Sequence, residues 1–257
     1  MSKRILNIVP VPVPPAALEA FAAQLPAEAV HPDFENVFVA AAAGARIIDS
    51  PYEQLLAEAF VLEAGCRAEE DGFAAVCVNS MSDSALSALR SRLNIPVVAP
   101  ASASMLLACM LGKKFSVITM WPRWHSLYEK TIVEHGIAHR VASIRNINVR
   151  PDAAELLAGK EDSVFELLHR EARAAIDQDG ADVIILGSTT MHQSYGYLKR
   201  VLEVPVISPG LVAEKIAELL VLTGTSHSKK TYPAPELIQD GLFALRPDSR
   251  GAAGSAA

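Results

Sequence analysis

Short runs of β-branched and other apolar residues alternate along this chain with longer stretches rich in alanine, leucine and glutamate. Such an alternation predicts βαβ units around parallel sheets, and therefore an α/β fold. The expected strands are 5–9, 37–40, 74–79, 97–99, 115–119, 141–146, 183–187 and 206–208. After the second strand, residues 52–70 predict an amphipathic helix. Its expected apolar side carries Leu55, Leu56, Ala59, Phe60 and Leu62.

An internal repeat is the most informative pattern in the chain. Segments 72–112 and 180–224 show one order of features at an offset of 108 residues: a glycine, an apolar strand, a serine, a helix and an apolar strand containing proline. Ser80 falls on Ser188 in this superposition. The repeat predicts two similar parallel-sheet α/β lobes related by a pseudo-twofold, with the active site in the cleft between them.

The repeat also suggests where the lobes begin and end. The expected first lobe combines residues 1–98 with 206–225, and the second spans 99–205. A C-terminal extension, 226–257, follows them. Its end, from about Pro247, is small and polar, which predicts disorder.

Composition and charge exclude several classes of protein. The chain has 257 residues, 51% hydrophobic and 20% charged, which is enough to bury a core. The net charge of -6 and the lack of a dense Lys/Arg cluster argue against a nucleic-acid partner. No apolar run reaches the roughly 18 residues of a membrane span, and early prolines interrupt any signal peptide. We therefore expect a cytoplasmic protein without a membrane partner.

No cofactor or metal is expected either. The three cysteines, Cys66, Cys77 and Cys109, have no CxxC spacing, and we expect Cys77 to be a small core residue. The sequence has no HExxH, P-loop or GxGxxG motif.

Candidate site residues follow the predicted strands, because ligands in open α/β sheets bind at the carboxyl ends of the strands. There, unpaired backbone N–H groups at helix N-termini favour an anion. We expect a pair of facing anion sites made by Ser80, Met81, Ser82, Ser188, Thr189 and Thr190. Thr119, at the end of another strand, adds a third hydroxyl. An alternative is that the serines only cap helices.

Two titratable residues lie about one helical turn beyond the serines. Asp83 and His192 are candidates for the acid and base of proton transfer, and Ser188 with His192 alternatively forms a nucleophile–base pair. The competing interpretations are a first-turn acid for Asp83 and a surface imidazole for His192. The aromatic loop 121–125 either walls the pocket or is a packed connection.

Together these residues resemble the aspartate/glutamate/hydantoin racemase superfamily, most of all its hydantoin-racemase-like branch. The resemblance extends from the first strand to about Gly224. It rests on the segments 4–10, 47–53, 80–86, 95–98, 115–119, 185–188 and 204–207. It implies two lobes that each place one catalytic residue on opposite faces of a substrate carbon, and it favours a homo-oligomer.

The resemblance also implies a departure in chemistry. Racemases of this superfamily use a cysteine pair without a cofactor, and the matching positions here hold Ser80 and Ser188. Of the family's usual Asn-Pro in the first loop, a contact for the substrate, this chain keeps only Pro10. A serine hydroxyl is a much weaker acid than a thiol, whose ordinary pKa is about 8.5.

The expected function is a cofactor-independent racemase or isomerase acting at a carbon alpha to a carbonyl. Its substrate would be a small amino acid, hydantoin or related carboxylate, including cyclic imides. The alternatives are a cysteine-less lyase, decarboxylase or hydrolase on the same cleft, or a non-catalytic protein that binds a small ligand.

Overall fold

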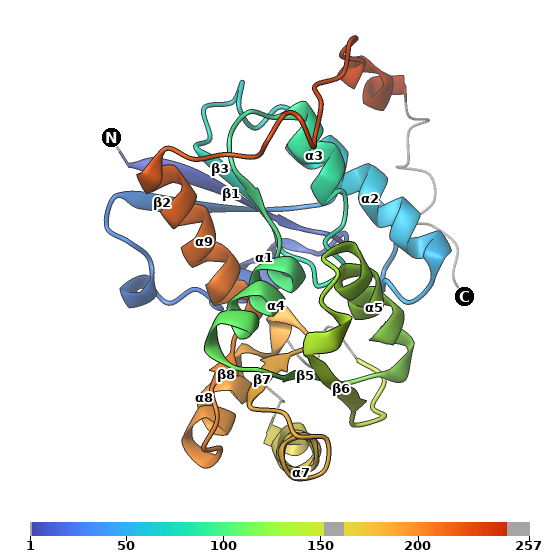
Figure 1. The fold of residues 1–257 in the computed structure, drawn as a ribbon. Helices are drawn as coiled ribbons and strands as arrows, with labels where there is room; N and C mark the ends of the chain where they lie inside the picture. Colours follow the sequence, from blue (N-terminus) through green and yellow to red (C-terminus); the bar gives the residue numbers. More distant parts are fainter. Residues whose placement is uncertain (1, 152–161, 246–257) are drawn as a thin grey trace, which may run out of the picture.

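Two four-stranded parallel sheets form the framework of the protein (Figure 1). The structure is a computed structural model and describes residues 2–151 and 162–245. The first sheet has the order β2-β1-β3-β4, and the second has the order β6-β5-β7-β8. The strands are β1 (Lys3–Val9), β2 (Phe34–Ala40), β3 (Ala75–Val78), β4 (Val97–Val98), β5 (Phe115–Thr119), β6 (Val141–Asn146), β7 (Val183–Leu186) and β8 (Val206–Ile207).

The strands agree with the hydrophobic pattern of the sequence. All eight expected strands are present, and β5 and β6 have the expected bounds. Every residue of β3, β5 and β7 is buried. Parallel sheets covered on both faces need such continuous apolar runs, because neither face meets solvent. The expected α/β class is therefore confirmed.

The helices of the described residues surround and separate the two sheets. They are α1 (Pro15–Ala22), α2 (Pro51–Gly65), α3 (Leu86–Arg92), α4 (Pro100–Leu111), α5 (His125–Glu134), α7 (Asp162–Asp177), α8 (His192–Val201) and α9 (Pro209–Thr223). Four of them begin at a proline, whose fixed φ and missing N–H suit the first helical position. None of the helices within 2–151 and 162–245 is long and apolar enough to cross a membrane.

Helix α2 differs from the expected one in its length and in the side that it buries. It ends at Gly65 rather than at residue 70, and its buried residues are Ala57, Val61 and Gly65. Leu55, expected on the buried side, is 67% exposed. A Cβ atom at Gly65 would lie 2.8 Å from the Ile8 side chain of β1, so this position needs glycine. Leu62, also on the expected apolar side, does pack against the core of the first lobe. The expected apolar side therefore coincides only in part with the side that α2 buries.

The last helix of each repeat packs on the sheet of the other repeat. Helix α4 follows β4 of the first sheet, yet its buried side contacts β5 and β7 of the second. Helix α9 follows β8 of the second sheet and packs on β3 and β4 of the first. This exchange gives two similar lobes in the expected pseudo-twofold arrangement. Strand β8, expected in the first lobe, pairs with β7 in the second sheet.

The segment that follows α9 runs across the end of α3 (Figure 1). Lys229 Nζ donates hydrogen bonds to three carbonyl oxygens at that helix end, those of Arg90, Ser91 and Leu93, at 2.6–2.9 Å. A cation at a helix C-terminus also complements the helix dipole. The part of the extension expected to be disordered, from about Pro247, lies outside the described residues.

His227, in the same segment, closes the free edge of β4. Its Nε2 atom accepts the Val97 backbone N–H at 2.6 Å, which requires a neutral imidazole. Burial, together with the positive charges of Arg90 and Lys229, lowers the pKa of His227 to about 4.

The stability of the protein should therefore depend on pH through His227. Between pH 6.5 and pH 4 the unfolded chain binds more protons at this residue than the folded one, so stability falls as the pH falls through this window. His227→Gln keeps an acceptor but does not titrate. We expect the difference in free energy of unfolding between natural protein and variant to shrink by about 1 kcal/mol from pH 7 to pH 4.5, allowing for solvent screening. Urea unfolding at both pH values measures this, and two parallel pH profiles would contradict it.

Candidate active site

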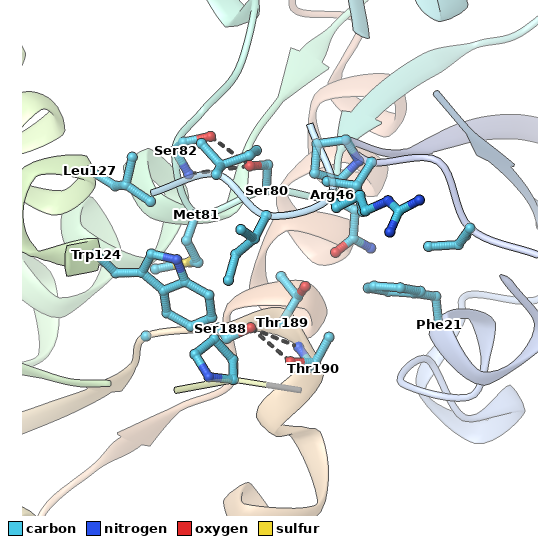
Figure 2. A pocket seen from close by; sticks show the side chains of 18 of the residues that line it. Phe21, Arg46, Ser80, Met81, Ser82, Trp124, Leu127, Ser188, Thr189 and Thr190 are labelled. Carbon is cyan, nitrogen blue, oxygen red and sulfur yellow. Dashed lines mark hydrogen bonds between the residues drawn. The ribbon is translucent and has the colours of Figure 1, made fainter. Parts of the chain in front are cut away.

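A pocket of about 940 Å³ lies where the carboxyl ends of strands from both sheets approach each other. Its walls are the loops that follow β1, β2, β3, β6 and β7, together with α1 and the start of α5. The lining residues are Pro10, Val11, Pro12, Val13, Pro14, Ala17, Phe21, Arg46, Ile47, Ile48, Asn79, Ser80, Met81, Ser82, Trp124, Leu127, Tyr128, Arg150, Pro151, Gly187, Ser188, Thr189 and Thr190. Figure 2 shows most of their side chains.

The pocket contains most of the residues that the sequence indicated. Those in its lining are Pro10, Ser80, Met81, Ser82, Ser188, Thr189 and Thr190. Thr119, Asp83 and His192 are absent from the lining. The aromatic loop serves in both of its expected ways, because Trp124 lines the pocket while Trp121 packs against the core of the second lobe.

Ser80 and Ser188 have matching surroundings in the two lobes. Each serine lies two residues beyond the end of its strand, Ser80 after β3 and Ser188 after β7. Ser80 Oγ accepts a hydrogen bond from the Ser82 backbone N–H, and Ser188 Oγ accepts one from the Thr190 backbone N–H, both at 3.3 Å. The hydroxyls of these partners lie 2.7 Å and 2.8 Å from the Oγ atoms. Figure 2 shows the two pairs on opposite sides of the pocket. The repeat in the sequence is therefore also a repeat of hydrogen-bond geometry.

A third hydroxyl sets the direction of the hydrogen bonds in the first lobe. Ser84 Oγ lies 2.6 Å from Ser82 Oγ, and Ser84 is completely buried. If Ser80 donated to Ser82 and Ser82 to Ser84, the Ser84 hydrogen would have no acceptor among the described residues, which costs about 1–3 kcal/mol. In the opposite order the Ser84 and Ser82 hydrogens both have acceptors, and only the Ser80 hydrogen, beside the pocket, lacks one among the described residues. Ser84 thus donates to Ser82, Ser82 donates to Ser80, and the Ser80 hydrogen is free to point at a ligand.

Asp83 caps a helix instead of facing the pocket. It is 2% exposed, and its carboxylate accepts hydrogen bonds from the Ala101 and Ser102 backbone N–H groups, at 3.0 Å and 2.9 Å, and from the Ser102 hydroxyl. These donors belong to the first turn of α4, which has no capping side chain of its own. Burial raises the pKa of Asp83, against the opposing effect of its hydrogen bonds.

His192 begins α8 outside the lining. Burial lowers the pKa of this imidazole below its ordinary value, against the smaller opposing effect of a hydrogen bond with the Thr190 backbone. The structure therefore does not bring His192 and Asp83 together across the pocket.

Thr119 lies behind the pocket wall and contacts Tyr128, one of the lining residues. Its hydroxyl is 2.8 Å from the Tyr128 hydroxyl, which donates to the Gly187 carbonyl oxygen at 2.6 Å. A Cβ atom at Gly187 would lie 2.5 Å from Cβ of Thr119 and 2.7 Å from the Tyr128 oxygen. Only glycine therefore fits between β7 and Ser188. Burial raises the pKa of Tyr128, so its phenol stays protonated and can keep this hydrogen bond.

The pocket has a positive rim and mostly neutral walls. Arg46 and Arg150 are both exposed, and no described lining residue is a Cys, His, Asp, Glu or Lys. Burial raises the pKa of the Cys77 thiol, which lies within β3. No group of three or more His, Cys, Asp or Glu residues within 2–151 and 162–245 is arranged to hold a metal ion.

Several lining residues were absent from the sequence-based site. Asn79 directly precedes Ser80, so the rule that ligands bind at strand ends was sufficient to suggest it. Arg46 and Arg150 lie in loops after β2 and β6, six and four residues beyond those strands. Tyr128 comes from one turn inside α5, where nothing in the local sequence marks it as a wall of this pocket.

Known proteins provide a comparison for this pocket and fold. A family model described as Asp/Glu/Hydantoin racemase matches residues 16–217. The chain is 33% identical to a hydantoin racemase of Pseudomonas sp. (strain NS671) over 211 residues, 81% of this chain and 83% of the relative. It is similar to the structure of an allantoin racemase from Klebsiella pneumoniae, with a TM-score of 0.83 and 29% identity over 92% of this chain and 95% of the other. An allantoin racemase structure from Pseudomonas fluorescens has a TM-score of 0.82 and 30% identity, over 92% of this chain and 98% of the other.

Proposed function

The chain belongs to the Asp/Glu/hydantoin racemase family, and from that premise we propose that it catalyses reversible proton loss at a carbon alpha to a carbonyl, without a cofactor. The substrate is a small cyclic amide or carboxylate bound between Ser80 and Ser188. The observation that carries the proposal is the matching geometry of these serines, which follow equivalent strands of the two lobes and face one pocket.

The pocket favours the negative charge that develops when the α-proton leaves. Removing this proton places charge on the carbonyl oxygen, as an enolate. The free Ser80 hydroxyl can donate to that oxygen, and the guanidinium groups of Arg46 and Arg150 make the potential at the pocket mouth positive. One well-placed donor to such an oxyanion is worth about 10²–10³-fold in rate. Stabilising the enolate is therefore the main contribution that we assign to the pocket.

Water accepts and returns the proton in this proposal. Neither serine is near its pKa at neutral pH, since a hydroxyl needs a neighbouring base to act as one. Reprotonation from either face of the planar enolate then interconverts the two enantiomers. Because hydroxide is the stronger base, the rate should rise with pH and show no plateau near the pKa of a thiol.

Proton NMR in D2O tests this function. The compounds are 5-benzylhydantoin, allantoin, aspartate, glutamate and benzylmalonate, each incubated with the natural protein and with Ser80→Ala/Ser188→Ala. We expect the α-proton signal of at least one compound to disappear without a new product, at least about 10-fold faster with the natural protein, as expected for loss of an oxyanion donor.

The other outcomes would contradict the proposal. Signals of a new compound would identify a lyase, decarboxylase or hydrolase. Thermal stabilisation by a compound that undergoes neither exchange nor conversion would favour a protein that only binds its ligand. Equal exchange rates for the natural protein and a folded Ser80→Ala/Ser188→Ala variant would show that the two serines take no part in the reaction.

A further inference from the structure

Asn79 presents an unpaired carboxamide at the pocket. It lies between the end of β3 and Ser80, lines the pocket and is only 3% exposed. Its backbone N–H donates to the Ile8 carbonyl oxygen at 2.8 Å, which holds the residue in place against β1. Its Oδ1 atom is buried without a partner, and its side chain makes no hydrogen bond with any described residue.

Asn7 and Gln24 also have a buried side-chain oxygen without a partner, but each donates from its amide nitrogen, Asn7 to Asn36 at 2.7 Å and Gln24 to the Phe21 carbonyl oxygen at 2.8 Å. Neither of them lines the pocket, so Asn79 is the one of the three that a pocket ligand can reach. Leaving a polar group unpaired away from water is unfavourable. Asn79 carries this cost at the pocket wall, where a ligand can remove it.

The chemistry of a carboxamide defines the ligand that fits it. A carboxamide holds one acceptor and one donor side by side, and which way the amide is turned only exchanges their places. Its complement is a cis amide, in which N–H and C=O lie on the same edge, and a ring enforces that geometry. A carboxylate offers acceptors alone, so it leaves the Asn79 oxygen unpaired. The adjacent Ser80 hydroxyl, directed by Ser84 through Ser82, supplies a further donor for a carbonyl oxygen.

We propose that Asn79 is a specificity-determining residue that pairs with the N–H/C=O edge of a cyclic amide and selects such rings over free carboxylates. The inference rests on the proposed function for the place where the ligand binds. It goes further by deciding between the two substrate classes and by assigning the choice to one side chain. The pairing places the carbonyl of the ring beside Ser80.

Calorimetric titration with three related probes tests this inference without turnover. The probes are 5-benzylhydantoin, its 1,3-dimethyl derivative, which lacks every N–H, and benzylmalonate, which carries the same benzyl group on a dicarboxylate. Natural protein should bind 5-benzylhydantoin at least about 10-fold more tightly than the dimethyl derivative. This comparison needs no variant.

The variant Asn79→Leu is measured with the same three probes, because leucine is similar in size to asparagine but its side chain has no polar atoms. It should weaken binding of 5-benzylhydantoin at least about 10-fold and change benzylmalonate less than about threefold. Its preference for the unmethylated ring should fall below about threefold. Asn94→Leu is the matched control, because Asn94 is exposed, bonds to Glu69 and lies outside the pocket lining. It should change none of the three constants.

Each contrary outcome has a separate meaning. Equal weakening of all probes by a folded Asn79→Leu would overturn the inference, because the residue would then only shape the pocket. A natural protein that binds the ring and its dimethyl derivative equally would overturn it as well. Selective binding of 5-benzylhydantoin without α-proton exchange would support the role of Asn79 and count against the proposed catalysis.

Discussion

Replacing both pocket serines in the double variant Ser80→Cys/Ser188→Cys is expected to raise the rate of α-proton exchange in 5-benzylhydantoin at least about 100-fold, the lower range for positioned acid–base catalysis. A thiol with an ordinary pKa near 8.5 is a few per cent ionised at pH 7, whereas a serine hydroxyl is not ionised. The Ser82 and Thr190 backbone N–H groups already point at the two Oγ atoms, and the same donors would favour a thiolate.

The pH profile separates thiolate catalysis from the reaction of the natural protein. Exchange by the double variant should reach a plateau above the thiol pKa, while that of the natural protein should keep rising with pH. Iodoacetamide should inactivate the double variant alone. Burial raises the pKa of Cys66 to about 11 and raises that of the fully buried Cys77, which slows their alkylation. The partly exposed Cys109 lies in α4 outside the pocket lining, so its alkylation leaves the pocket open.

The single variants provide the internal control. Ser80→Cys and Ser188→Cys each supply a base on one face only, so each should exchange the proton faster than it inverts the carbon. Chiral chromatography of the same samples measures inversion. A double variant with an unchanged melting temperature and the exchange rate of the natural protein would show that these positions are not placed for two-base chemistry.

Asp83→Ala is expected to lower the free energy of unfolding by about 3 kcal/mol while leaving ligand binding nearly unchanged. The substitution leaves two backbone N–H groups of α4 without an acceptor, and each unpaired buried group costs about 1–3 kcal/mol. The Ser102 hydroxyl loses its bond to Asp83 but keeps His135 Nε2, 2.9 Å away. Alanine also fits poorly at φ +48°, a backbone conformation that aspartate and asparagine tolerate better. Removing the carboxylate also removes the free-energy cost of burying its charge, which offsets part of this loss.

Asp83→Asn is the matched variant for this prediction. It tolerates the same backbone and keeps one acceptor oxygen, so it should lose only about 1 kcal/mol, one net hydrogen bond. Urea unfolding measures both variants, and titration with 5-benzylhydantoin should give binding constants within about threefold of the natural one. If Asp83→Ala kept its stability but lost α-proton exchange, the sequence-based hypothesis of a catalytic base would be right and the capping role would be wrong.

The strands and the repeat could be predicted because they depend on local patterns. A parallel strand covered on both faces is rich in apolar residues, as in β3 and β7, and the eight segments expected from the sequence are the eight strands. The loops after β3 and β7 were identifiable as pocket walls for the same reason, since strand direction decides which end faces a ligand. Ser80, Ser188 and their neighbours accordingly line the pocket.

The roles of Asp83 and of α2 could not be read in this way. Periodicity places Asp83 about one turn after Ser80, but its partners Ala101 and Ser102 come 18 and 19 residues later and reach it only when α4 packs. Periodicity also predicts the largest residues of α2 on its buried side. The close approach of α2 to Ile8 requires glycine at position 65, and Leu55 stays exposed.

The α/β class, the duplicated architecture and the loops that carry the two serines all follow from the order of apolar and polar residues along the chain. Which side chains meet in the pocket depends on three-dimensional packing. The folded chain places Arg46, Tyr128 and Arg150 in one pocket with the serines and keeps Asp83 and His192 out of its lining. It also leaves the Asn79 carboxamide oxygen without a hydrogen-bond partner among the described residues. The physical reason is that hydrogen bonds and close packing act through space, between residues whose separation along the chain carries no record of their contact.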